Sequence, residues 1–118
     1  MALSYAAGDN LVFQMESGFG LARVLGSEGA GPGTVWHVLV YFDFYPDVEA
    51  AEAALASGRA LDVREPHLAL TEHAFEKTPA ARLANRPVAG AELEAVERWR
   101  REGGPVHDRS LLLMLGMR

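Results

Sequence analysis

The sequence predicts an α+β fold in which two helices pack on a bent antiparallel sheet or barrel of about five strands. Three patterns support this prediction. Residues 8–26 show two short strand patterns joined by a glycine turn, a long apolar segment follows at 35–45, and helix signals bracket 47–57 and 90–102. The chain has 118 residues, of which 49% are hydrophobic, so it can bury one core but not two independent ones.

We therefore expect a single domain over residues 1–118. Its barrel-like part covers about 8–45, a helix covers about 47–57, and a mixed C-terminal part covers about 60–118. The chain contains no cysteine, which excludes disulfides, thiolate metal sites and thiol catalysis. Residues 1–5 lack the features of a secretory signal, and no apolar run has the length of a membrane span. We expect a cytoplasmic protein of bacterial type.

The opening hairpin shows the period-two alternation of strands with one buried face. Ser17 and Gly18 supply the turn, since glycine adopts positive φ without strain. In the second strand small residues on one face allow tight curvature or a close backbone approach. The residues expected to share the apolar face of the first strand are Leu11, Phe13 and Met15. The small-residue face of the second strand carries Gly20, Ala22 and Val24.

The third predicted strand, at 35–45, is the longest apolar run and presents two different faces. One face is expected to lie in the core and carries Trp36, Val38, Val40, Phe42 and Phe44. The other is mixed and carries Val35, His37, Leu39, Tyr41, Asp43 and Tyr45. Because tyrosine offers a large apolar area with a hydroxyl group, the mixed face could be a partly exposed binding stripe. The alternative is that it packs under a helix with its polar tips at the rim.

The remaining elements follow from capping and breaking residues. Asp47 is a good helix N-cap and Gly58 a natural stop, while the second helix, over about 90–102, ends at the sequence Gly-Gly-Pro. Two short strands are expected around Pro66, at 61–63 and 68–70. The segment between the prolines at 79 and 87 is expected to be irregular or helical. The apolar tail must dock as a last strand or short helix.

Charge is unevenly distributed along the chain. Residues 1–58 hold seven acids and one base, a net charge of −6, whereas the remainder holds nine acids and ten bases, a net charge of +1, which together make −5. An acidic surface repels phosphates, so nucleic acid is an unlikely partner, and it suits a protein with a basic surface. Solubility alone is the alternative explanation. The expected partner contacts are Asp9, Glu16, Phe19, Tyr41, Asp43 and Tyr45.

Other candidate chemistry is sparse. His37, His67 and His73 could assemble an imidazole metal site, but no dense ligand spacing accompanies them, and we expect no metal, no cofactor and no catalytic residues. The arginines of the second helix are interleaved with glutamates. The pairs Glu94–Arg98 and Glu97–Arg101 have the favourable i,i+4 order, which indicates a solvated, salt-bridged face.

The hairpin resembles the start of a bacterial immunity protein family from polymorphic-toxin systems, catalogued as immunity protein twenty-six. The residues that carry the resemblance are Gly8-Asp9, Leu11-Val12-Phe13, Gly18 and the segment from Gly20 to Leu25, with the apolar strand 35–44. The same rhythm opens many SH3-like and Tudor-like barrels, including the polymerase-interacting domain of CarD-type transcription regulators. The chain differs from CarD-type regulators in its acidic charge and in lacking a basic helical half. The resemblance implies an SH3-like fold and an interaction role, with no catalytic residues.

The leading hypothesis is therefore a non-enzymatic protein-binding module, and the resemblance implies an immunity protein that neutralises a toxin by steric capture. One alternative is a transcription-associated module that contacts RNA polymerase. Another is a small histidine-based metal-binding protein or enzyme. A homo-oligomer through the apolar tail, Leu111–Leu115, is also open.

Overall fold

The computed structural model describes residues 3–116, which form a five-stranded antiparallel sheet with the strand order β4-β3-β2-β1-β5. The strands are β1 (Asp9–Met15), β2 (Gly18–Glu28), β3 (Val35–Tyr45), β4 (Val63–Thr71) and β5 (Ala80–Asn85). The helices are α1 (Val48–Ala56), α2 (Glu72–Glu76), α3 (Gly90–Glu102) and α4 (Leu111–Met114), with a short 3-10 turn, η1, at Gly31–Gly33. The α+β prediction is confirmed. β4 and β5 form the two outer edges, so the sheet of this described part is open.

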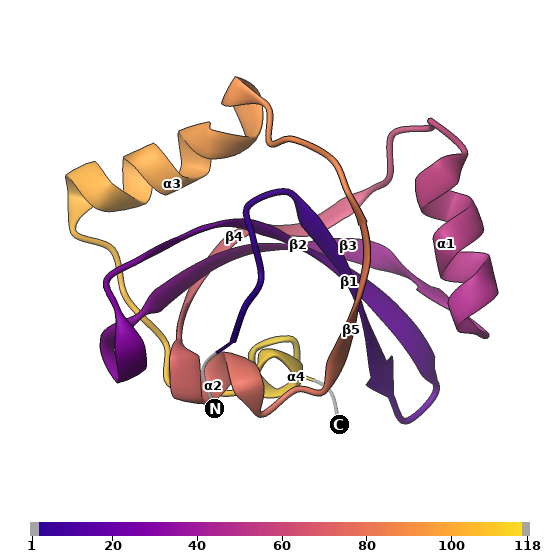
Figure 1. Cartoon of the computed structure of the whole chain (residues 1–118), viewed down its shortest axis with the longest axis horizontal. Coiled ribbons are helices and arrows are strands. Elements are labelled where there is room, and N and C mark those ends of the chain that lie inside the picture. The colour runs from indigo at the N-terminus through magenta and orange to yellow at the C-terminus, as the bar shows by residue number, and fades with distance from the viewer. Residues whose placement is uncertain (1–2, 117–118) are drawn as a thin grey trace.

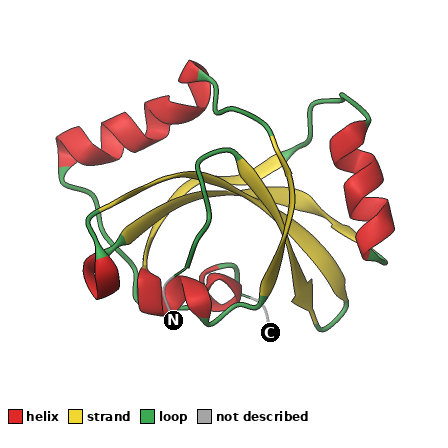
Figure 2. Cartoon of the chain, in the orientation of Figure 1, coloured by secondary structure: helices red, strands yellow, loops and turns green. Residues whose placement is uncertain are grey.

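The sheet is bent, and helices cover both of its faces (Figure 1). α2 and α4 lie under one face, while α1 and α3 lie against the other at separate ends (Figure 2). No helix within residues 3–116 is both long enough and apolar enough to cross a lipid bilayer.

The larger core lies between the sheet and the short helices α2 and α4. Trp36 packs against Phe75 with ring centroids 5.8 Å apart, and the ring of Tyr5 meets both. Leu111 and Leu115 of the tail are buried here, which confirms that the tail docks as a short helix. The buried members of this core are Leu11, Phe13, Met15, Ala22, Val24, Trp36, Val38, Val40, Leu68, Leu70, Ala74, Phe75, Leu111 and Leu115.

The smaller core lies on the opposite face, under α1 and α3. Its buried members are Val12, Leu21, Leu25, Leu39, Tyr41, Ala51 and Val96. Beside it the fully buried Arg23 of β2 binds Glu92 of α3, with 2.7 Å between Nε and Oε2. The same guanidinium donates to the carbonyl oxygens of Gly8 and Pro87. This network fixes the start of α3 to the sheet, and the sequence analysis did not identify it.

The predicted hairpin is confirmed. Met15 faces Gly18 across the turn, and Gly18 has a φ of 151°. Gly20 shows why the second strand carries small residues: a Cβ atom there would lie 2.5 Å from Cζ of Phe13. The Phe13 ring therefore lies directly against the β2 backbone.

Two expectations for the second half of the chain are wrong. In place of two strands at 61–63 and 68–70 there is one bulged strand, β4, which begins only at Val63. Pro66 is tolerated in it because β4 is an edge strand. The segment between the two prolines is strand β5 and not irregular or helical. Its alanine-rich sequence has no strand pattern of its own, and it is extended because it pairs with β1.

The two long helices have the predicted positions. The Asp47 side chain accepts a hydrogen bond from the N–H of Ala50 at 2.8 Å, and Gly103 ends α3 in the left-handed conformation. The predicted i,i+4 ion pairs on α3 are wrong for the described residues. Instead, Arg100 binds Glu97 and reaches across to Glu28 of β2, because α3 lies against the sheet and offers that closer carboxylate.

Candidate functional site

The end of β3 extends beyond its neighbour β4. The β3–β4 register ends at Tyr41 opposite Val63, with one further bond from the N–H of Phe42 to the carbonyl of Asp62 at 2.8 Å. On the other side, pairing with β2 continues to Tyr45 opposite Phe19. Within residues 3–116, no strand pairs with the outer edge of 43–45. The backbone groups along this edge can accept an added strand.

The aromatic side chains at this end are a correction to the sequence analysis. Phe42 and Phe44 were expected in the core, but their exposed fractions are 56% and 45%. They lie on the same face as the buried Trp36 and Val40, as the alternation predicted. They are exposed because β4 ends beside them and the core built on α2 and α4 does not extend to this end of the strand.

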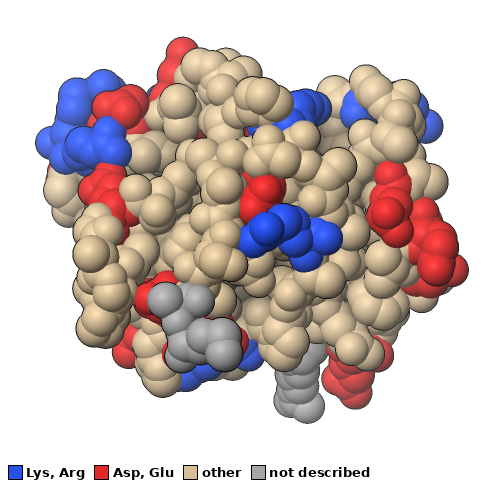
Figure 3. Space-filling view, in the orientation of Figure 1, with Lys and Arg blue, Asp and Glu red and all other residues tan. Residues whose placement is uncertain are grey.

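Carboxylates lie at the same end of the sheet, although Asp43 and α1 are on the opposite face from the two rings. Glu16 of the β1–β2 turn and Asp43 of β3 are exposed, and Asp47, Glu49 and Glu52 continue the series onto α1. No lysine or arginine occurs between positions 23 and 59 of the sequence. Figure 3 shows acidic atoms over α1 at the right and over the hairpin tip at the lower right. We name this surface the acidic aromatic end and define it as Glu16, Phe19, Phe42, Asp43, Phe44 and Tyr45.

Four of the six predicted contact residues lie at the acidic aromatic end. Glu16 and Asp43 are exposed, and Phe19 and Tyr45 are half-buried against α1. The other two, Asp9 and Tyr41, are buried within the chain and present no free surface.

Asp9 has a structural role. Its carboxylate accepts hydrogen bonds from the N–H of Ala6 at 2.8 Å and from Nδ2 of Asn85 at 2.9 Å, and it binds Arg82 at 3.1 Å. Burial opposes ionisation, but these bonds and the Arg82 charge outweigh it and leave the pKa of Asp9 below its ordinary value. This carboxylate links the segment that precedes β1 to the strand β5.

The mixed face of β3 packs under the helices, which is the second of the two alternatives drawn from the sequence. His37 and Tyr41 have exposed fractions of only 2% and 6%, so the idea of a continuous exposed binding stripe is wrong for its first half. Burial raises the pKa of Tyr41. Beyond the covered part of the strand, Asp43 is exposed and Tyr45 is half-buried.

Two of the three candidate metal-ligating histidines meet under α3. Nδ1 of His37 lies 2.8 Å from Nε2 of His67, and Nε2 of His37 lies 3.3 Å from Oε1 of Glu28. Because a carboxylate only accepts, we assign the Nε2 proton of His37 to the bond with Glu28. Nδ1 of His37 then accepts from Nε2–H of His67. Burial lowers the pKa of both rings, and the neighbouring His37 helps to lower that of His67 to about 4.

This histidine pair is part of the contact between α3 and the sheet. The ring of Trp99 on α3 meets His37 at 4.8 Å and His67 at 5.8 Å between centroids. His73 lies on α2, with its side chain 64% exposed, and does not join them. In the part of the chain that the structure describes, no three potential ligands gather. After the assigned bonds, the pair offers one free nitrogen, whereas protein zinc sites use three or four ligands.

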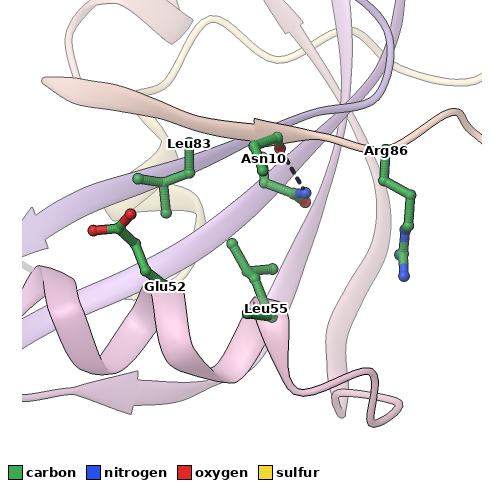
Figure 4. Close-up of a pocket in the computed structure, with 7 residues that line it drawn as sticks. Asn10, Glu52, Leu55, Leu83 and Arg86 are labelled. Atoms are coloured by element: carbon green, nitrogen blue, oxygen red, sulfur yellow. Dashed lines mark hydrogen bonds between the residues drawn. The ribbon is translucent and has the colours of Figure 1, made fainter.

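A pocket of about 280 Å³ lies between α1 and β5. Its lining consists of Asn10, Glu52, Leu55, Ala56, Leu83, Ala84 and Arg86. Figure 4 shows Leu55 rising from α1 toward Asn10, with Glu52 to one side and Arg86 to the other. This pocket was not predicted from the sequence, because one of its walls is β5, whose residues show no strand pattern.

Comparisons with protein-family models, with curated proteins and with solved structures find no match to this chain. The function is therefore argued from the surface, the pocket and the charges of the molecule itself.

Proposed function

We propose that this protein is a non-enzymatic binding module that captures a protein with a basic surface at its acidic aromatic end. The observation that carries the proposal is the exposure of Phe42 and Phe44 at the same end of the sheet as Glu16 and Asp43. Aromatic side chains are enriched among the residues that dominate binding energy in protein interfaces. Two adjacent exposed phenylalanines are costly to leave in water, which supports a role in recognition.

The charges give this surface a preferred partner. An acidic patch attracts a basic protein over a distance and speeds its association, while the contacts made after docking set the lifetime of the complex. The open backbone edge at 43–45 adds hydrogen-bonding groups that can pair with an extended segment of the partner. Aromatic anchors, carboxylates and a free strand edge therefore occur together at one end of the sheet.

Finer interpretations belong to the same proposal. A bent antiparallel sheet that begins with a tight hairpin supports an SH3-like relationship, and the resemblance of that hairpin suggests an immunity protein acting by steric capture of a toxin. Contact with RNA polymerase is the alternative partner class. The absence of cysteine favours a cytoplasmic location.

The test uses three immobilised baits and the protein's own nuclease-treated lysate, at low and moderate salt. The baits are the wild-type protein, the double variant Glu16→Lys/Asp43→Lys, and the control Glu94→Lys/Glu102→Lys, which reverses two exposed charges on α3. We expect one partner, weakened by salt, on the wild-type and control baits and little on the first variant. Equal retention by all three baits would refute the assigned surface, and no retention by any would refute the binding module.

Association kinetics sharpen the result once that partner is purified. Charge reversal at Glu16 and Asp43 should slow association by about tenfold at low salt, and the difference should shrink as salt screens the charges. The control variant should retain the wild-type rate and salt dependence. If the Glu16→Lys/Asp43→Lys variant associated at the wild-type rate at low salt, these two carboxylates would be excluded from the encounter with the partner.

A further inference from the structure

A second pocket of about 280 Å³ lies on the mixed face of β3, the face covered by α1 and α3. Arg59 enters its lining from the loop between α1 and β4, and Arg86 from the loop between β5 and α3. Segments distant in sequence therefore bring two guanidinium groups to one cavity, which we name the arginine pocket. Its lining consists of Leu39, Tyr41, Leu55, Arg59, Ala60, Leu61, Val63, Arg86 and Glu92.

The charges around the arginine pocket do not balance. Neither Arg59 nor Arg86 forms an ion pair with a carboxylate of residues 3–116. The carboxylate in the lining, Glu92, is already bound by the buried Arg23 at 2.7 Å and 3.1 Å, and it accepts a hydrogen bond from the N–H of Ala89 at 3.0 Å. Three guanidinium groups and one carboxylate leave two positive charges uncompensated. The pocket therefore attracts an anion, although the chain as a whole is acidic.

The acidic residues nearest in sequence stay outside this cavity. Asp43, two residues beyond Tyr41 on the same face of β3, and Asp62, next to Leu61, are exposed and are not part of the lining. Because water and salt screen exposed charges, these two carboxylates weaken the attraction without cancelling it.

The side chain of Arg86 belongs to this pocket. Figure 4 shows it apart from Asn10 and directed away from Leu55. Its charge acts on Tyr41 and Glu92, which both line the arginine pocket. Burial raises the pKa of Tyr41, although the charges of Arg23 and Arg86 oppose this, so the hydroxyl keeps its proton at neutral pH. Tyr41 therefore supplies a neutral donor close to the guanidinium.

The remaining wall of the arginine pocket is apolar. Leu55 and Leu61 are half-buried against the smaller core, and Val63 is 43% exposed. A ligand that covers Val63 would remove this apolar surface from water, which favours binding. The pocket thus combines two cations, a hydroxyl donor and an apolar wall.

We propose that the arginine pocket binds a small organic acid, a carboxylate on a short apolar chain. The carboxylate accepts hydrogen bonds from Arg59, Arg86 and the Tyr41 hydroxyl, and the chain lies against Leu61 and Val63. Guanidinium groups match the planar geometry of a carboxylate, and hydrogen bonds between charged groups are stronger than neutral ones. A cavity of about 280 Å³ is at the small end of ligand pockets, which suits an acid of about six to ten carbons. This inference does not depend on the protein partner proposed above.

The position of Glu92 favours a carboxylate over a phosphate. Phosphates in proteins are often held by the backbone N–H groups at a helix N-terminus. Here the N-terminus of α3 carries the Glu92 carboxylate, which accepts from the N–H of Ala89 and repels a second anion of high charge. The donors left for a ligand are side chains.

The experiment titrates the intact chain at low salt with four small probes and follows methyl groups by NMR. The probes are hexanoate, hexanol, hexylammonium and hexyl phosphate, which share one chain and differ in head group. We expect saturable shifts of the Leu61 and Val63 methyl groups with hexanoate at millimolar concentrations, weaker binding of hexyl phosphate, and no saturable shift with the other two probes. Leu83 lines the neighbouring pocket and not this one, so its methyl groups should not shift.

Arginine variants connect this binding to the pocket. Arg59→Gln and Arg86→Gln should each weaken hexanoate about threefold, and the double variant about tenfold, because the two exposed charges act independently. Arg98→Gln removes an exposed guanidinium of α3 outside the lining and should change the affinity less than about 1.5-fold. Thermal unfolding at the wild-type temperature would show that the variants retain the fold.

The outcomes separate the possible explanations. No saturable shift with hexanoate, equal binding of hexanol, or equal effects of Arg86→Gln and Arg98→Gln would overturn the assignment of the pocket. Tighter binding of hexyl phosphate than of hexanoate would overturn the carboxylate as the head group.

Discussion

The two parts of β3 differ in what covers them. Residues 35–41 run between β2 and β4, with helices against both faces, and even the polar His37 and Tyr41 are buried there. Residues 42–45 continue past the end of β4, and the apolar Phe42 and Phe44 are exposed. Alternation along the strand therefore decides which face a side chain occupies. Whether that face is buried depends on elements distant in sequence.

The largest expected effect is on stability in the covered part. Trp36→Ala removes a side chain that is 4% exposed and packs against Tyr5 and Phe75, so it should lower the free energy of unfolding by about 3–5 kcal/mol. Chemical denaturation measures this loss. A loss below about 1 kcal/mol would show that the first part of β3 is not more tightly packed than its end.

The second effect concerns the helix that covers the mixed face. Glu92→Gln leaves the buried Arg23 charge without its carboxylate, and the unfolding free energy should fall by about 3 kcal/mol. Glu94→Gln, an exposed position on the same helix, should change it by less than about 0.5 kcal/mol. Denaturation of the two variants under identical conditions makes the comparison, and equal losses would remove Arg23 as the anchor of α3.

The third effect is a pH dependence of the covered part. Burial, with help from His37, lowers the pKa of His67 from 6.5 to about 4, so the unfolded chain binds the proton more readily. Stability should therefore fall as the pH drops from about 6.5 toward 4. Because solvent partly screens the ring, we expect a loss of about 1 kcal/mol between pH 7 and pH 5.

The matched measurement is urea denaturation at pH 7 and pH 5 with two histidine variants. His67→Gln should remove most of this loss, and His73→Gln, at the exposed histidine of α2, should retain it. A wild-type protein equally stable at both pH values would contradict the neutral, buried histidine pair.

The smallest expected effect on stability is at the exposed end. Phe44→Ala should lower the free energy of unfolding by less than about 1 kcal/mol, because nearly half of the side chain, 45%, is already in water. The same substitution should weaken the partner at least about tenfold if this ring is an interface anchor. Calorimetric titration with the purified partner measures the second effect. Normal affinity in a stable Phe44→Ala variant would remove Phe44 from the interface.

Elements with their own end signals were predictable from the sequence. Asp47 caps α1, Gly103 closes α3, and the Gly18 turn joins β1 to β2, each through local chemistry visible in a few residues. β5 was not predictable in this way, because residues 80–85 carry no alternation and become a strand only by pairing with β1. The continuity of β4 through Pro66 was not predictable either, since a proline is tolerated there only because β4 is an edge strand.

The candidate site was predictable only in part. The acidic character of the first half and the exposure of Glu16 and Asp43 agree with the sequence analysis. The exposure of Phe42 was not foreseen, because it follows from where β4 ends. The contact of His37 with His67 depends on the β3–β4 register, and the pocket lined by Asn10 depends on the positions of α1 and β5. Such arrangements have no signature along the chain.

The most direct test is amide hydrogen exchange along β3, with and without the captured partner. In the free protein, the amides of residues 36–41 should exchange slowly, and those amides of residues 43–45 that point to the unpaired outer edge should exchange quickly. Binding should protect 43–45 and the turn at 16–18 while leaving the helix α3 unchanged. Protection confined to α3 and the histidine pair, with 43–45 still exchanging quickly in the complex, would contradict the assignment of the acidic aromatic end as the binding surface.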